Sequence, residues 1–280
     1  MITIAKLTIG EAARRRVLWV LVILALLAVG ITAWGVATLV QGARDRGLGD
    51  LEIKFAVSQI LIFIAFMFGF VLVMTAAFFG SPAIATDLES GVAQAMLARP
   101  LRRSSYLIGR WLGLAAVIVA YAVLAGLLAI FAIGAVSGYT PPDVLTPIAY
   151  LSGQAIVLLT LTVLLSTRLP PIAGGAIAVV AYGLAWMAGV LGKIGVALGT
   201  DALVGVGNAL HYLLPTDALW QGVVFGLEPP LVRSLVGNTF AGQSPFYADA
   251  PPPIAIVAWS VIWVALILAL AVNQLRRREL

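Results

Sequence analysis

The chain of 280 residues contains no cysteine and a single histidine, and charged residues make up only 10% of it. Without cysteine, disulfide bonds, thiolate metal sites and cysteine nucleophiles are excluded. The single histidine, His211, cannot form a His-based metal cluster within one chain, and it is the only imidazole that a Ser-His protease could use. The apolar runs almost lack acidic residues, which carriers driven by protons or sodium ions normally need, so a secondary carrier is only a minor alternative.

A phosphate-binding loop of the form G-x-x-x-x-G-K-[ST] is also missing from the chain. The nearest string, Gly189 to Ile194, has the wrong spacing and ends in isoleucine. The chain therefore cannot hydrolyse ATP by that route. We expect no catalytic residue, no metal site and no cofactor in this chain.

Apolar residues dominate the composition, with 62% hydrophobic residues and a mean hydropathy of +1.07. These values exclude a soluble globular domain. A helix that crosses a bilayer needs about 20 consecutive apolar residues. We therefore predict an all-α polytopic membrane protein with one transmembrane domain over residues 1–280. Its six predicted spans are Val17–Val40, Phe55–Gly80, Tyr106–Val136, Thr146–Thr167, Ile172–Leu191 and Ile254–Val272.

The Lys and Arg residues are distributed unevenly between the two sides of these spans. With both termini inside, about 12 of the 17 Lys and Arg residues lie inside. An excess of Lys and Arg in short cytoplasmic loops sets the orientation of a membrane protein. We therefore expect a multi-pass protein of the cytoplasmic (inner) membrane with both termini cytoplasmic and Arg276–Arg278 as a stop-transfer anchor. The same asymmetry explains the basic pI without a nucleic-acid partner.

Residues 1–16 precede the first span and have their own pattern. Ile2, Ala5 and Ile9 lie near one helical face, with Lys6 and three arginines beside them, which indicates a short interfacial helix. The competing interpretation is a signal peptide. However, the apolar run that follows has about 24 residues, well above the 7–15 of a signal-peptide core, and no Ala-x-Ala site comes after it.

The segment from Pro82 to Gly113 concentrates charge between two long apolar runs, so it cannot lie in hydrocarbon. Asp87 and Glu89 stand at its acidic end, and the basic end holds Arg99, Arg102 and Arg103. From charge alone, an ordinary cytoplasmic loop whose arginines fix the orientation explains the segment equally well.

A short amphipathic helix is expected within this segment. Pro82 suits the first turn of a helix, because its missing N–H group is not needed there. Residues Ala83–Leu97 then form the helix, and Arg99-Pro100 closes it because the residue before a proline disfavours helical geometry.

The order of residues in the segment favours a more specific interpretation. Asp87-Leu88-Glu89-Ser90-Gly91 is followed by an apolar run that ends in Leu97-Ala98-Arg99-Pro100, and Gly109-Arg110-Trp111-Leu112-Gly113 opens the next span. This string resembles the loop between the second and third spans of ABC-2 type transporter permeases, the membrane subunits of one class of ATP-binding-cassette exporter. The usual string of that family is Glu-x-Gly-Thr, and here Val92 replaces the threonine.

The resemblance implies a permease subunit that moves a substrate by alternating access while separate subunits hydrolyse ATP. Two copies, or one copy and a second permease, would pair with two ATP-binding-cassette subunits that carry ATP and magnesium. Residues 82–103 would form the cytoplasmic coupling segment, whose helix sits in a cleft of the ATPase. The implied coupling residues are Asp87, Glu89, Ser90, Gly91 and Arg99. The alternative is a membrane scaffold or assembly factor with no transport of its own.

Candidates for a substrate path come from three of the predicted spans. Phe66 and Phe70 belong to an aromatic run in the second span, which a lipid-facing or packing surface explains equally well. The Ser and Thr hydroxyls of the fourth span can bond to carbonyl groups of their own helix, whereas the amide of Gln154 cannot do so as easily. Tyr182 lies in the fifth span. The fourth and fifth spans are rich in Gly, Ser and Thr, which favours contact with protein over lipid.

Residues 192–253 form the longest segment outside the predicted spans. Two fairly apolar stretches, Ala202–Leu214 and Ala218–Leu227, are expected to be short helices on the outer side. Permeases of the ABC-2 type carry short extracellular helices between spans five and six, so this region is similar to the family as well. We expect His211 to be a polar side chain at the membrane interface.

Overall fold

The computed structural model describes residues 1–14, 16–91, 102–230 and 244–278, and the elements in these ranges are helices without any strand. Six of the helices are long and apolar enough to cross a membrane. The predicted all-α architecture with six spans is therefore confirmed. The helices are α1 (Ile2–Arg14), α2 (Arg16–Asp45), α3 (Asp50–Gly80), α4 (Pro82–Glu89), α6 (Arg103–Ser137), α7 (Leu145–Ser166), α8 (Pro171–Leu198), α9 (Asp201–Leu213), α10 (Thr216–Leu227) and α12 (Ile254–Arg276).

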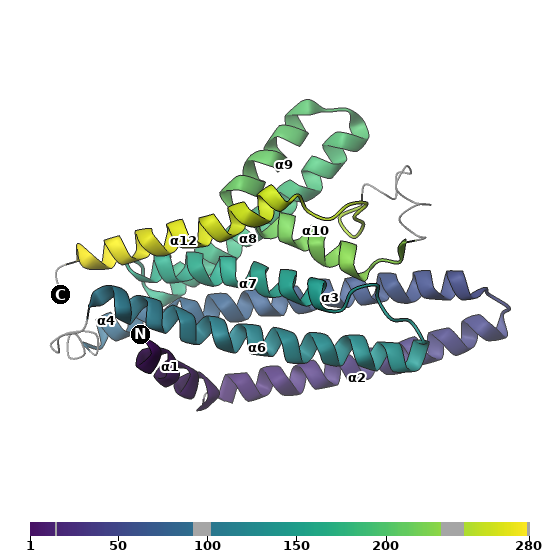
Figure 1. Cartoon of the computed structure of the whole chain (residues 1–280), viewed down its shortest axis with the longest axis horizontal. Coiled ribbons are helices and arrows are strands. Elements are labelled where there is room, and N and C mark those ends of the chain that lie inside the picture. The colour runs from purple at the N-terminus through teal and green to yellow at the C-terminus, as the bar shows by residue number, and fades with distance from the viewer. Residues whose placement is uncertain (15, 92–101, 231–243, 279–280) are drawn as a thin grey trace.

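Helices α2, α3, α6, α7 and α12 run roughly along the long axis of the molecule, whereas α8 and α9 form a hairpin that projects to one side (Figure 1). Helix α1 lies against α6. Both ends of the chain lie at the same end of the bundle as α4, which we call the α4 end (Figure 1). The α2–α3 and α6–α7 connections lie at the opposite end.

Except for α7, which is shifted by one residue from its predicted span, the spanning helices extend beyond the predicted spans. The largest difference is in the fifth span, which was expected to end at Leu191 but continues to Leu198 as α8. Gly199 then ends the helix in a left-handed conformation with φ of +65°, which glycine adopts without steric cost. The added turns pack against α9, where Cα of Gly192 and Cα of Gly207 face each other.

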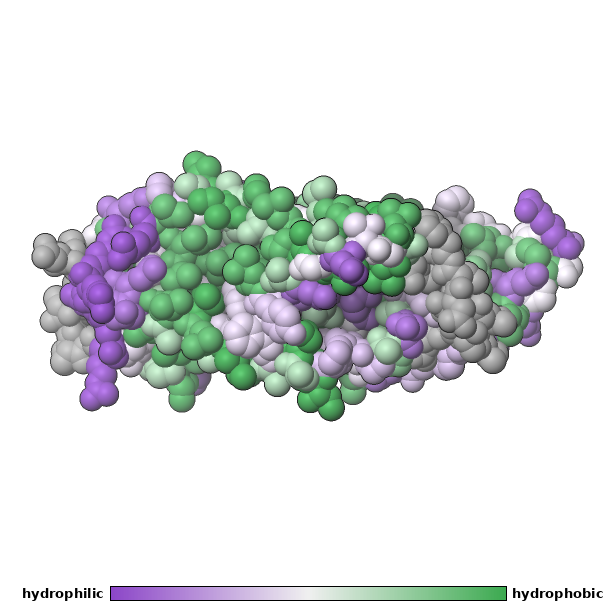
Figure 2. Space-filling view, turned by 90° about the horizontal axis from the view of Figure 1, so that it is seen from above, coloured by the Kyte–Doolittle hydropathy of each residue, from purple (hydrophilic) through white to green (hydrophobic). Residues whose placement is uncertain are grey.

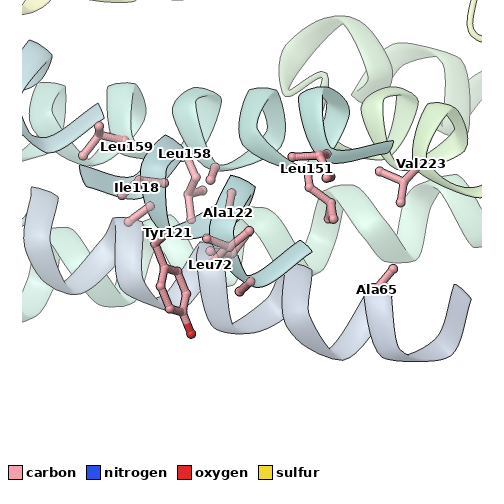
Figure 3. Close-up of a cluster of buried hydrophobic side chains, with 14 of the residues drawn as sticks. Ala65, Leu72, Ile118, Tyr121, Ala122, Leu151, Leu158, Leu159 and Val223 are labelled. Carbon is pink, nitrogen blue, oxygen red and sulfur yellow. The ribbon is translucent and has the colours of Figure 1, made fainter. Parts of the chain in front are cut away.

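Helix α7 forms the centre of the bundle. Leu158, Leu159 and Val163 have no exposed surface. Figure 3 shows Leu158 and Leu159 beside Ile118 of α6 and Leu72 of α3, and all four belong to one buried cluster. Contact between helices in a bilayer depends on such close packing, because lipid is as apolar as the side chains themselves. The prediction that the fourth span contacts protein rather than lipid is thus met by contacts between α7 and other helices of the same chain.

The hydroxyl groups of α7 do not disturb this packing. Ser152 donates to the carbonyl oxygen of Ile148 at 2.8 Å, and Thr162 donates to that of Leu158 at 2.7 Å. Each hydroxyl is thus satisfied within its own helix, as expected for Ser and Thr in a span. Helix α8 differs from α7, since Ile177, Val180 and Leu184 are exposed on this chain, so contact of that face with protein stays a prediction.

The short helices α9 and α10 confirm the two helices expected between spans five and six. Two tryptophans of α12 bond to the end of α9. Trp259 Nε1 donates to the carbonyl oxygen of Tyr212 at 2.8 Å, and Trp263 Nε1 donates to that of Leu213 at 2.9 Å. These bonds satisfy carbonyl groups at the end of α9 that have no partner within the helix.

The start of α7 is capped by a carboxylate from the preceding loop. Asp143 Oδ1 accepts hydrogen bonds from the backbone N–H groups of Leu145 at 2.9 Å and Thr146 at 3.1 Å, and the hydroxyl of Thr146 donates to Oδ2. The bonds from Thr146 hold the pKa of the Asp143 carboxyl below its ordinary value. Because the pKa of Asp143 is lower in the folded than in the unfolded protein, its ionised form stabilises the fold. This stabilisation is fully present above the unfolded-state pKa and is lost as the pH falls through the folded-state pKa.

We expect Asp143→Ala to lower the free energy of unfolding by about 1 kcal/mol at pH 7, because the first N–H groups of α7 lose their acceptor. Asp143→Asn keeps an acceptor oxygen and should stay within a few tenths of a kcal/mol of the wild type at this pH. Unfolding of the detergent-solubilised protein, followed by tryptophan fluorescence, measures both differences. Equal midpoints for Asp143→Ala and the wild type at pH 7 would contradict the capping role.

Candidate functional site

Helix α4 continues from α3 with hardly a break. Ser81 between them has helical geometry, with φ of −65° and ψ of −39°, and Pro82 occupies the first turn of α4 as expected. The prediction of one helix over Ala83–Leu97 is wrong, because α4 ends at Glu89. The reason is Gly91, whose φ of +74° lies in the left-handed region that terminates helices. The family resemblance places Gly91 among the coupling residues, and its observed conformation gives it a local role in ending α4 as well.

A buried charge network ties α4 to its neighbours. Asp87 accepts hydrogen bonds from the hydroxyl of Tyr106 and from Nη2 and Nε of Arg110, the last at 3.2 Å. Nη1 of Arg110 also contacts Oε2 of Glu11 at 2.6 Å. The side chains of Arg110 and Asp87 keep only 15% and 12% of their surface exposed. We call Glu11, Asp87, Tyr106 and Arg110 the α4 network, and it joins α1, α4 and α6.

The seam between α1 and α6 brings Glu11 within reach of Arg110. A Cβ atom on Gly113 would lie 2.6 Å from Cβ of Thr8, and one on Gly109 would lie 2.8 Å from Cβ of Ile4. Only glycine allows the two helices to come so close, which explains the Gly-x-x-x-Gly pattern at the start of the third span. Helix α1, expected at the membrane interface, thus buries a full face against α6, formed by Ile4, Thr8 and Ala12.

The four coupling residues other than Gly91 divide into three groups. The side chain of Asp87 is buried within the α4 network, whereas Glu89 and Ser90 are exposed at the end of α4. Arg99 lies outside the described residues. Sequence reasoning missed Glu11, Tyr106 and Arg110 as partners of Asp87. The available signal was Arg110 itself, because a charge that enters an apolar span needs a partner.

Arginines at the start of α6 and after α12 close the same end of the bundle. Nη1 of Arg103 donates to the carbonyl oxygens of Leu275 at 3.1 Å and Arg276 at 3.0 Å, where α12 leaves acceptors without helical partners. Arg278 donates to the carbonyl oxygen of Thr167 at 2.5 Å, just after α7. Figure 2 shows hydrophilic side chains gathered over this end beside a hydrophobic flank. The α4 end is therefore a polar surface held together by side-chain contacts between helices.

Three of the four candidates for a substrate path lie around the start of α10. Gln154 Nε2 donates to the carbonyl oxygen of Thr216 at 3.1 Å and to the hydroxyl of Tyr182 at 3.4 Å. The ring of Phe66 packs against a group of aromatic rings at centroid distances of 5.3 to 5.4 Å, formed by Trp186, Trp220 and Phe246. Phe70 is 47% exposed and does not join this group. A substrate path along these residues stays a prediction.

The chain matches a known protein family over nearly its whole length. The family described as ABC-2 family transporter protein matches residues 2–280, nearly the whole chain. No curated protein matches the chain.

Proposed function

The chain belongs to the ABC-2 family of transporter proteins, and from this premise we propose that it is the permease subunit of an exporter driven by separate ATP-binding subunits. The observation that carries the proposal is the α4 end, where a short helix with an exposed tip is bonded to two other helices. The sequence has no phosphate-binding loop, so the energy for transport must come from a partner.

The exposed tip of α4, with Glu89 and Ser90, is the part that we propose to enter a cleft of the ATPase. Because α4 continues from α3, a displacement of its tip would move α3 directly. The α4 network would pass the same displacement to α6 and α1. Rigid-body rocking of this kind converts a small movement at one site into a switch between two packed states of the helices.

We further propose that the α4 end faces the cytoplasm and that two permease subunits assemble with two ATP-binding subunits. The excess of Lys and Arg at this end supports the orientation. The exposed apolar face of α8, with Ile177, Val180 and Leu184, is available to a second permease subunit or to lipid. The role that we assign to Asp87 changes accordingly, from direct contact with the ATPase to positioning of α4.

Glu89→Lys tests the coupling role. We expect the variant to insert and fold normally, because the side chain is exposed, but to lose the ATPase on purification or to hydrolyse ATP without transport. A charge-assisted bond contributes about 1.5–3 kcal/mol, so its loss should weaken the complex roughly 10- to 150-fold. Titration of the purified permease with its ATPase measures this change.

Asp45→Lys is the matched control, since Asp45 is an exposed acid at the end of α2, on the opposite end of the bundle. It should leave the affinity for the ATPase unchanged. Full complex yield and full transport with Glu89→Lys would show that α4 has no coupling role. If the wild-type chain supported the assembly of other membrane proteins but never bound an ATPase, the alternative function of a membrane scaffold would be favoured instead.

A further inference from the structure

A cavity of about 630 Å³ lies where α8, α9, α10 and the segment before α12 meet, away from the α4 end. Its volume is in the range of sites that hold small organic ligands. Part of its wall is apolar, including Val196, Val204, Pro252 and Ile256. The polar side chains that line it come from four separate segments: Lys193, Asn208, His211, Asp217, Gln221 and Asp249.

Asp217 is the most deeply placed charge in this cavity, with 4% of its surface exposed. Its Oδ2 atom lies 2.6 Å from Nε2 of His211. The carboxylate rests on the bare backbone of Gly189, because a Cβ atom at that position would overlap all three atoms of the carboxyl group. The glycine therefore leaves room for a carboxylate at this place.

The second oxygen of Asp217 has no donor within the described residues. A carboxylate accepts up to about four hydrogen bonds, so this oxygen still has capacity for a further donor. Since Asp217 lines the cavity, a donor carried by a ligand can reach this oxygen from the cavity side. The unused acceptor thus points to a ligand that carries a hydrogen-bond donor, either N–H or O–H.

Lys193, the cation in the cavity wall, already donates hydrogen bonds to the backbone of the protein. Nζ of Lys193 donates to the carbonyl oxygens of Ser244 at 2.9 Å and Tyr247 at 2.5 Å, which holds the segment before α12 against α8. Lys193 keeps its positive charge, but the carboxylates of Asp217 and the exposed Asp249 outnumber it, so these three residues of the wall carry a formal net charge of −1. The cavity therefore favours a cation over an anion.

We propose that this cavity binds a small organic cation, in which a protonated amine on an apolar body donates a hydrogen bond to Oδ1 of Asp217. The apolar walls contact the body of the ligand, and the charge-assisted bond orients it. The proposal goes beyond the permease function and does not rest on it, because binding is measured on the full chain without an ATPase.

Three probes of nearly the same shape and different charge test the proposal by calorimetry on the chain in lipid nanodiscs at pH 7. They are 2-phenylethylammonium, the neutral 2-phenylethanol and the anionic 3-phenylpropanoate, each corrected for uptake by empty nanodiscs. We expect saturable one-site binding of the cation, at least tenfold tighter than that of the alcohol, and no saturable binding of the anion. Equal affinities for the cation and the alcohol, tighter binding of the anion, or no saturable binding of the cation would overturn the proposal.

Two variants assign the effect to Asp217. Asp217→Asn removes the charge but keeps the shape, and Gly189→Ala keeps the charge but displaces the carboxylate, so each should weaken binding of the cation at least tenfold. Asp201→Asn is the control, since this exposed acid in the first turn of α9 is not part of the cavity wall and should leave the affinity within twofold. Wild-type affinity in folded Asp217→Asn would overturn the proposal, as would an equal loss in Asp201→Asn.

Discussion

Arg110→Leu should lower the free energy of unfolding by about 3–5 kcal/mol, because it leaves the carboxylate of Asp87 buried without its cation. The guanidinium of Arg110 contacts Asp87 through two nitrogens and Glu11 through a third, so its loss also releases α1 from the network. We expect poor yield and a clearly lowered melting temperature in detergent. Thermal unfolding followed by tryptophan fluorescence measures the change.

The double variant Asp87→Asn/Arg110→Leu separates the buried charge from the loss of contacts. Asparagine keeps an acceptor for the hydroxyl of Tyr106 but carries no charge, so the double variant should recover a large part of the lost stability. Recovery of this kind indicates that the cost comes from the unpaired carboxylate. If both variants were equally unstable, or if Arg110→Leu melted like the wild type, the buried ion pair would not have the role that we assign to it.

Gly113→Leu should separate α1 from α6. A Cβ atom at this position would lie 2.6 Å from Cβ of Thr8 and 2.8 Å from the carbonyl oxygen of Ala5, so the backbone of α1 must move. Overpacking of this kind costs about 1–3 kcal/mol, occasionally more, and here it also draws Glu11 away from Arg110. Increased proteolysis within α1 and a lowered melting temperature measure the effect.

Gly30→Leu is the matched control for this variant. Gly30 lies within α2, and a Cβ atom there would meet nothing within 4 Å. The same substitution should therefore leave the melting temperature unchanged or raise it slightly, because leucine favours helix more than glycine does. Equal loss in both variants would mean that leucine is harmful in any span, and the α1–α6 seam would lose its special role.

The number of spans could be predicted from the sequence, because the length of an apolar run decides whether a helix can cross a bilayer. The short helices α9 and α10 could be predicted as well, since Pro215 and the diproline at Pro229 interrupt the chain at their ends. The length of α4 could not. A glycine within a polar segment fits a helix interior or a helix end, and only the backbone of Gly91 distinguishes the two.

The partners of the candidate residues could not be predicted from the sequence either. Glu11 and Arg110 are 99 positions apart, and the close approach of α1 to α6 alone brings them together. Likewise, His211 was expected to be a polar side chain at the membrane interface, and its pairing with Asp217 over Gly189, where α8, α9 and α10 meet, could not be foreseen. Such clusters depend on tertiary packing. The coupling role of Glu89 and Ser90, which lie exposed at the end of α4, rests on the family resemblance and stays a prediction.

Single-cysteine cross-linking at Ser90 tests most directly whether α4 docks into an ATPase. The chain has no cysteine of its own, so Ser90→Cys supplies its only thiol, and Leu48→Cys supplies an exposed thiol in the α2–α3 connection at the opposite end. Cross-linking in native membranes should join the Ser90 variant to a protein that carries a G-x-x-x-x-G-K-[ST] loop, as identified by mass spectrometry, with a yield that changes when ATP is added. The Leu48 variant should give no such product. A Ser90 variant that forms no product with an ATP-binding protein, while the complex remains intact, would contradict the account.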